Sequence, residues 1–214
     1  MTSLEQIAFF QGRRDEVPNQ KLARSLASLE DQAGIREIAE NLSNSNQNVR
    51  SDCLKVLYEI GYLKPELIAG YVDDFLKLLK DKNNRMVWGG MIALSTIASE
   101  KAERIWEQVE DIKFAIQHGS LITQVAGIKT LSRAASLNMV YSQEIFPFML
   151  DMMRNSIPRD LITHAEEISQ IVDESNEAEF INLLESRSPE MTANQLARFR
   201  KIVKKLEKEL RDRQ

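Results

Sequence analysis

Apolar residues recur along this chain at one fixed interval of 37 positions. The segment that begins at Val49 places its apolar residues on one face of a helix, and that face returns at Met86 and at Thr123. The columns that carry the pattern are Cys53, Gly90, Gly127 and His164; Val56, Ala93, Thr130 and Glu167; and Leu57, Leu94, Leu131 and Ile168. A further copy from Asp160 is weaker. Self-similarity at such a period predicts stacked repeats, each with one helix of this kind.

A second apolar stripe lies between these helices and keeps the same period. Its columns are Ile35, Val72, Val109, Phe146 and Leu183, and Ile38, Phe75, Ile112 and Met149. Polar segments over 41–48, 80–84, 117–120 and 154–158 separate the two stripes of each repeat, and no stretch has the alternation of a strand. The sequence therefore predicts an all-α domain over 1–214, with about five helix pairs over 31–214 and an N-terminal cap over 1–30.

Two segments carry a resemblance to a known family. "VRSDCLKVLYEI" from Val49 is similar to the second helix of a HEAT repeat, and "EIFPFMLDMMRNS", with Pro147 inside it, is similar to the first. The chain thus resembles the HEAT-repeat, armadillo-like α-solenoids, in particular prokaryotic HEAT-repeat proteins of no evident specific function. The resemblance implies a right-handed superhelical α-α solenoid. Most repeats lack an arginine equivalent to Arg50, and the last pair drifts by one residue.

Gly89 and Gly90 stand side by side in a helix, where each costs about 1 kcal/mol relative to alanine. Gly90 belongs to a core column that faces the first helix of its own pair. Gly89 lies about 100° around the helix and faces a neighbouring repeat. Both positions predict a close approach between helices.

The outer face of the second helices is the predicted binding surface, because in solenoids this face lines the concave side. Its positions, which we call the ladder, are Ser51, Lys55, Tyr58 and Tyr62; Trp88, Ile92, Ser95 and Ser99; Val125, Lys129, Ser132 and Ser136; and Ile162, Glu166, Ser169 and Asp173. Aromatic and aliphatic residues are unusual on a solvated face. The candidate partner-binding residues are Lys55, Tyr58, Tyr62, Trp88, Ile92 and Lys129, with Trp88 as an apolar anchor. The alternative is that Trp88 only packs against its neighbours.

Composition narrows the classes of partner. The 214 residues carry a formal net charge of −4, so the whole molecule is not attracted to phosphate backbones. The single cysteine, Cys53, excludes an internal disulfide framework and fits a reducing compartment. The start has no basic segment before its short apolar run, and the most apolar window, 86–98, is too short for a membrane span. We expect a cytoplasmic protein with no membrane partner.

The residue types of catalytic and metal sites do not gather in the sequence. His118 and His164 are far apart and read as cap or surface residues, and Cys53 lies in an apolar column. No phosphate-binding loop, metalloprotease motif or nucleophile elbow occurs. We expect no cofactor, no metal and no catalysis.

One enzyme class stays as an alternative, because some DNA glycosylases that remove alkylated bases are built from HEAT-like repeats with a basic groove. Trp88 and Trp106 would fit such a groove, but Lys55 and Lys129 are the only cations on the ladder. Phosphate contacts dominate DNA affinity, which disfavours this reading.

The C-terminal segment over 197–214 is basic, with eight Lys or Arg against three Glu or Asp, and residues 1–196 carry the compensating net charge of −9. Phe199, Ile202, Val203, Leu206 and Leu210 would pack this helix on the preceding repeat as a capping helix. Its cations could instead bind an acidic partner or RNA. The candidates are Arg198, Arg200, Lys201, Lys204, Lys205 and Lys208. The sequence thus predicts a protein-interaction scaffold, with a nucleic-acid-associated protein as the alternative.

Overall fold

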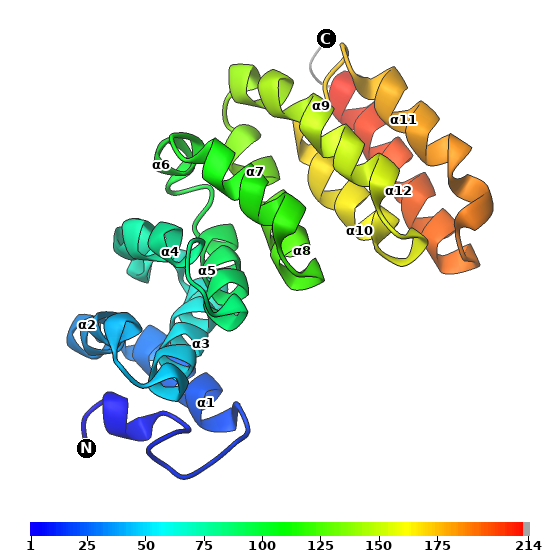
Figure 1. The fold of residues 1–214 in the computed structure, drawn as a ribbon. Coiled ribbons are helices and arrows are strands. Elements are labelled where there is room, and N and C mark those ends of the chain that lie inside the picture. Colours follow the sequence, from blue (N-terminus) through cyan, green and yellow to red (C-terminus); the bar gives the residue numbers. More distant parts are fainter. Residues whose placement is uncertain (212–214) are drawn as a thin grey trace. The chain divides into compact units, whose positions relative to one another are not determined.

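Every regular element in the described part of the chain is helical (Figure 1). The computed structural model describes the backbone of residues 1–211 and the side chains through Lys208. Its α-helices are α1 (Val17–Leu29), α2 (Gln32–Glu40), α3 (Gln47–Leu63), α4 (Val72–Leu78), α5 (Asn84–Thr96), α6 (Ala102–Trp106), α7 (Val109–His118), α8 (Leu121–Ala135), α9 (Met139–Asn155), α10 (Pro158–Ile168), α11 (Glu177–Ser186) and α12 (Ala193–Arg211). Short 3-10 turns extend several of them.

Ten of these helices form the five predicted pairs, α2/α3, α4/α5, α7/α8, α9/α10 and α11/α12. The boundaries fall where the polar segments predict them. Asn46 and Asn83, one repeat apart, cap α3 and α5 by accepting bonds from the backbone N–H of Asn48 and Arg85, both at 2.9 Å. Helix α1 and the short α6 lie outside the pairs.

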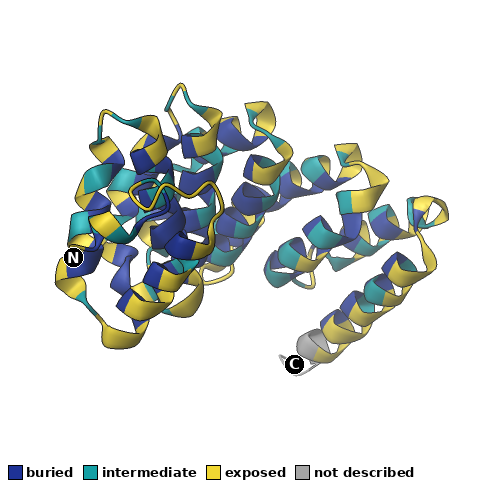
Figure 2. Cartoon of the chain, turned by 90° about the horizontal axis from the view of Figure 1, so that it is seen from below, coloured by how far each residue is buried: buried dark blue, intermediate teal, exposed yellow. Residues whose placement is uncertain are grey.

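The core follows the predicted columns (Figure 2). Cys53 and the column Leu57, Leu94, Leu131 and Ile168 are fully buried, as are Ile38, Phe75, Ile112 and Met149 on the first helices. The period of 37 therefore records which residues fill the space between the helices of each pair.

The glycine pair closes two different contacts, as predicted. A Cβ atom at Gly90 would lie 2.9 Å from the Cβ of Leu78 and 3.1 Å from the carbonyl oxygen of Phe75, both on α4, the first helix of its pair. A Cβ atom at Gly89 would lie 2.5 Å from a methyl carbon of Leu54 on α3, in the preceding repeat. Each glycine lets α5 approach one neighbour more closely than a side chain would allow.

The chain divides into two compact units, residues 1–130 and 131–214. In the first, Arg50 donates to the carbonyl oxygen of Leu42 at 2.8 Å and pairs with Asp81, which ties the turns of two successive repeats. In the second, the guanidinium of Arg187 donates to the carbonyl oxygens of Met153 at 2.9 Å and Ser156 at 2.8 Å. The description of 1–214 as one solenoid domain stays a prediction.

No helix among the described residues has the length and apolar character needed to span a membrane.

Candidate protein-binding surface

Four of the six predicted binding residues form one continuous set of contacts in the first unit. The ammonium of Lys55 lies 4.8 Å from the centre of the Tyr58 ring, and the rings of Tyr58 and Tyr62 meet edge to face at 6.1 Å. On α8, the ammonium of Lys129 lies 5.9 Å from the centre of the Tyr62 ring. Lys129 and Tyr62 therefore connect two helices that are two repeats apart.

Helix α5 lies between these two helices. It packs against α3 through Gly89, and it meets α8 where the hydroxyl of Thr130 lies near Met91. Side chains from α3 and α8 therefore converge over the ladder face of α5. Trp88 and Ile92 stand on the ladder face of α5 and are half-buried. They add partly accessible apolar area to the ladder.

Two of the predicted binding residues are not accessible, which corrects the sequence prediction. Lys55 is only 8% exposed and Tyr58 only 6%. The reason is that α1 packs on α3 and that Glu16, at the start of α1, reaches Lys55 Nζ at 2.8 Å; Glu59 reaches it at 2.7 Å. Burial alone would lower the pKa of Lys55, but the hydrogen bonds to Glu16 and Glu59 outweigh it and raise the pKa. Lys55 is a structural cation.

The N-terminal segment packs on the first repeat in two ways. Helix α1 lies against α3 as a preceding half repeat would, while the loop before it folds over the start of α3. The backbone N–H of Phe9 donates to Asp52 at 2.8 Å, and the side chain of Asn19 donates to the same carboxylate at 2.9 Å. The sequence did not point to Glu16, because its contact with Lys55 joins residues far apart in the chain.

One whole column of the predicted ladder is buried. Tyr58, Ser95, Ser132 and Ser169 are each one repeat apart, and all are buried, as are Ser51 and Ile162. The hydroxyls of Ser95 and Ser169 donate to carbonyl oxygens of their own helices, at 2.7 and 2.9 Å. The prediction that this column faces solvent was therefore wrong. The accessible part of the ladder is Tyr62, Trp88, Ile92, Val125 and Lys129 in the first unit, with Ser99, and Ser136, Glu166 and Asp173 in the second.

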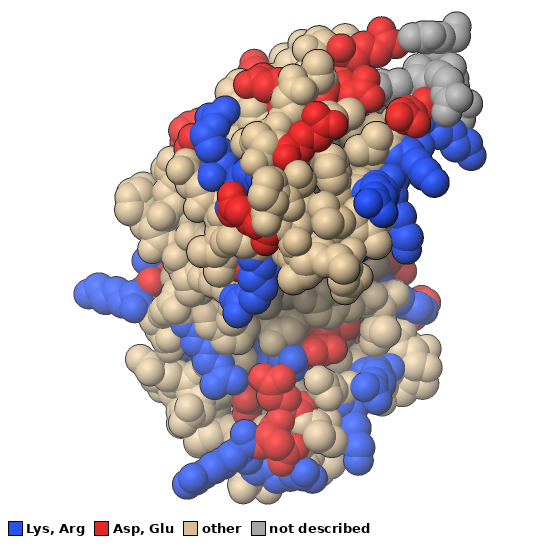
Figure 3. Space-filling view, turned by 90° about the vertical axis from the view of Figure 1, so that its right-hand side faces the viewer, with Lys and Arg blue, Asp and Glu red and all other residues tan. Residues whose placement is uncertain are grey.

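Helix α12 packs as a capping helix and carries an exposed basic stripe. Phe199, Ile202 and Leu206 are buried, whereas Arg200, Lys201, Lys204, Lys205 and Lys208 are exposed, and Figure 3 shows a group of Lys and Arg side chains at the upper right of that view. Arg198 differs from the others, because it pairs with Glu166 at 2.7 Å, which raises the pKa of its guanidinium. It holds α12 to α10. The side chain of Leu210, predicted to pack with the apolar residues of α12, lies outside the described residues.

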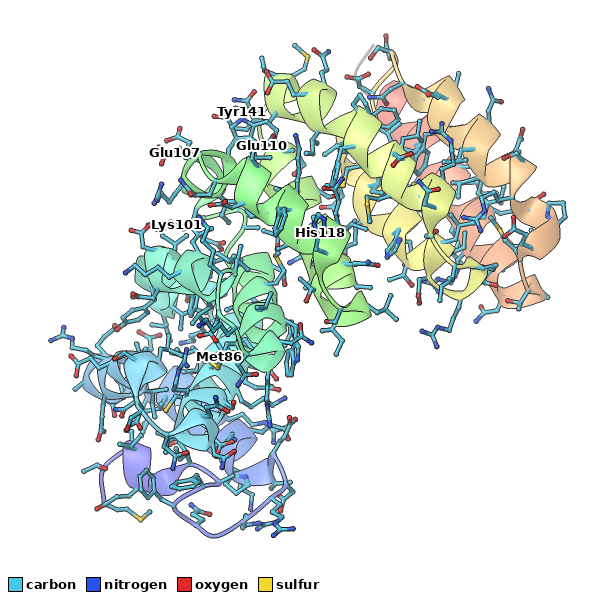
Figure 4. The ribbon with its side chains drawn as sticks, viewed as in Figure 1. Met86, Lys101, Glu107, Glu110, His118 and Tyr141 are labelled. Carbon is cyan, nitrogen blue, oxygen red and sulfur yellow. The ribbon has the colours of Figure 1, made fainter. Side chains whose placement is uncertain are left out.

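The reactive residue types lie apart. Cys53 is fully buried, which raises the pKa of its thiol to about 12 and keeps it protonated. His118 ends α7, where it stacks on Phe114 with 4.2 Å between ring centres (Figure 4). The described residues contain no group of three or more His, Cys, Asp or Glu placed to hold a metal ion.

His164 corrects the prediction of a cap or surface residue. It lies inside α10 and is only 3% exposed, and neither ring nitrogen has a hydrogen-bond partner. Burial lowers the pKa of the imidazole, while the nearby Asp160 acts in the opposite direction. His164 thus occupies the core as a neutral ring, in the same column as Gly90.

Comparisons with known proteins agree on the fold. No protein-family model and no curated protein matches the chain. Two engineered proteins solved by the Northeast Structural Genomics Consortium, targets OR329 and OR497, are similar in structure. OR329 has a TM-score of 0.69 and 16% identity, over 97% of this chain and 98% of its own. OR497 has a TM-score of 0.67 and 17% identity, over 95% of this chain and 58% of its own.

A designed armadillo repeat protein, YIII(Dq.V1)4CPAF, solved in complex with the peptide (KR)4, is similar with a TM-score of 0.63 and 14% identity, over 94% of this chain and 97% of its own. The chain has the fold of an α-solenoid repeat protein. Identities this low establish the fold alone.

Proposed function

We propose that this chain is a non-catalytic protein-interaction module that binds a partner segment along the accessible ladder of its first unit. The observation that carries the proposal is the meeting of Tyr62 and Lys129 over α5. On the ladder face α5 presents apolar area from Trp88 and Ile92, and Lys129 adds a cation. Recognition sites commonly combine aromatic anchors with a few polar groups in this way.

The structural comparison supports the same use of the fold. The designed armadillo repeat protein was solved with a bound peptide, (KR)4. Solenoids present an extended surface formed by successive repeats, and an extended or helical segment can lie along it.

A matched pair of aromatic substitutions tests the proposal. Tyr62 on the ladder and Phe114 on α7 are both exposed aromatic side chains, at 54% and 63%. Wild type, Tyr62→Ala and Phe114→Ala would each be immobilised and used to capture proteins from the native cell lysate, with circular dichroism as a check on helix content. A discrete protein retained by wild type and by Phe114→Ala, and lost by Tyr62→Ala, supports the ladder. If the same proteins are retained by all three, the ladder is not the binding surface.

The absence of catalysis is part of the proposal and has its own test. Incubation with alkylated DNA should release no base beyond the rate without protein. Base release that disappears when an acidic residue near the ladder, such as Glu59, is changed to Gln would establish the glycosylase alternative instead.

The exposed basic stripe on α12 supports a second candidate, a nucleic-acid-associated protein. Arg200, Lys201, Lys204 and Lys208 form no ion pair among the described side chains, so their charges are available to phosphates. This candidate predicts RNA affinity that falls steeply with salt and is lost when Lys204 and Lys208 are changed to Glu. The net charge of −4 and the lack of exposed aromatic residues on the stripe favour the protein-binding proposal.

A further inference from the structure

A cleft of about 440 Å³ opens beside the ladder, between the N-terminal loop and the starts of α3 and α5. Its charged lining consists of three arginines and three carboxylates: Arg13, Arg14, Arg85, Asp15, Glu16 and Asp52. The formal charges balance. What the cleft can bind therefore depends on which of these groups already have partners.

All three carboxylates are engaged within the protein. Both oxygens of Asp52 accept hydrogen bonds, from Phe9 and Asn19. Asp15 accepts from Nε of Arg13 at 2.9 Å and from the backbone N–H of Val17 at 3.1 Å. Glu16 binds the buried Lys55 at 2.8 Å. The acidic groups of the cleft hold the N-terminal loop in place.

Two of the three guanidinium groups remain available. Arg14 is exposed and forms no hydrogen bond or ion pair with any described residue. Arg85 has 46% of its side chain exposed, and its ion pair, to Glu16, spans 3.9 Å, which is too long for a hydrogen bond. A guanidinium offers five donors in a planar fork that matches a carboxylate. The cleft thus presents donors without matching acceptors.

Arg85 also joins the cleft to the ladder. It precedes Trp88 by three residues and Ile92 by seven on α5, so the three side chains form one stripe along the same helix face. Three residues of helix rise about 4.5 Å, which is little more than one residue of an extended chain. A segment that covers Trp88 therefore places its next one or two residues at the cleft.

We infer that the cleft binds a carboxylate of the partner segment, so that the ladder selects acidic segments in which a Glu, Asp or free C-terminus lies one or two residues from an apolar anchor. Arg14 and Arg85 hold the carboxylate, and Trp88 and Ile92 contact the anchor. This inference rests on the proposed function of the ladder and adds the chemistry of its partner.

Peptide pools of matched composition test this selectivity. Three fluorescent pools of short peptides alternate Leu, Phe or Trp with only Glu, only Gln or only Lys, and all have amidated C-termini. Fluorescence anisotropy should show at least tenfold tighter binding of the Glu pool than of the Lys pool to wild type. Arg14→Gln and Arg85→Gln should each weaken the Glu pool at least threefold. Lys77→Gln, an exposed lysine on α4 with the same charge change, should have no such effect.

A fourth pool distinguishes the source of the carboxylate. The Gln peptides with a free C-terminus should bind more tightly than their amidated form if the cleft takes a chain end, and equally if it takes side chains. Equal or tighter binding of the Lys pool, still lost in Tyr62→Ala, would overturn the carboxylate site and leave the ladder proposal standing. If no pool shows binding that depends on Tyr62, the ladder proposal itself is wrong and the inference falls with it.

Discussion

Lys129 on α8 holds its ammonium 5.9 Å from the centre of the Tyr62 ring on α3, although α5 lies between the two helices. A cation over an aromatic face at an exposed site contributes about 0.5–1 kcal/mol. The contact therefore joins the first and third of three successive second helices with a small stabilising free energy, and either side chain can exchange it for a contact with a partner.

A double-mutant cycle measures this contact. Tyr62→Leu and Lys129→Met, alone and combined, should show a coupling of about 0.5–1 kcal/mol in the free energy of unfolding. Both tryptophans, Trp88 and Trp106, lie in the first unit, so their fluorescence during urea unfolding reports on the unit that holds the contact. Strictly additive effects of the two changes would mean that the residues do not interact in solution.

Lys55 should behave as a structural residue. Lys55→Met leaves Glu16 and Glu59 without their shared cation, and we expect a loss of about 1–3 kcal/mol, at the lower end because Glu16 is half exposed. Urea unfolding followed by tryptophan fluorescence gives the value. Lys77→Met, at an exposed lysine on α4, should change stability by less than about 0.5 kcal/mol. Recovery of part of the loss by adding Glu16→Gln would confirm the mechanism.

Gly89 and Gly90 on α5, and Gly70 in the 3-10 turn before α4, should respond differently to alanine. At Gly90 the new Cβ meets main-chain and Cβ atoms of α4, which cannot rotate away, so we expect a net loss of about 1–2 kcal/mol despite the better helix propensity. At Gly89 it meets the end of the flexible Leu54 side chain, and the loss should be smaller. Gly70 has no atom within 4 Å of an added Cβ, so Gly70→Ala should be neutral or slightly stabilising. Thermal unfolding should rank the variants in this order, and equal melting temperatures for Gly90→Ala and Gly70→Ala would contradict it.

Acid should weaken the second unit through His164. Burial lowers the pKa of His164 in the folded state below the value near 6.5 that it has when unfolded. Between these two values the unfolded chain binds more protons, so the free energy of unfolding falls as the pH drops below about 6.5, by at most about 1.4 kcal/mol per pH unit.

Circular dichroism at several pH values, for wild type and for His164→Leu, measures this effect, since no tryptophan lies in the second unit. The variant should lose the dependence, and His118→Gln, at the exposed end of α7, should retain it. An unchanged pH profile in His164→Leu would assign the effect to other groups.

The architecture is predictable from the sequence because it rests on columns that repeat. The buried positions Leu57, Leu94 and Leu131 keep the period without a gap, and the capping residues Asn46 and Asn83 obey it too. Each repeat packs its two helices in the same way, so one set of repeated apolar positions predicts the packing of every repeat.

The accessible surface is less predictable, because its limits depend on contacts that do not repeat. A shift of a fraction of a helix turn moves the column of Tyr58 and Ser95 from the predicted surface into the interior. The contact between Glu16 and Lys55 joins a single loop to a single helix, and nothing in a periodic pattern signals it. The burial of His164, by contrast, follows from its column, although its residue type alone suggests the surface.

Glu16 forms an ion pair with the buried Lys55 at the N-terminal end of the ladder. Because this contact is made within the chain, the position of Lys55 is already filled, and a partner segment cannot extend past it along the ladder. A surface of repeating units would otherwise let a segment slide by one repeat at little cost. One closed end turns a repetitive surface into one with a unique alignment.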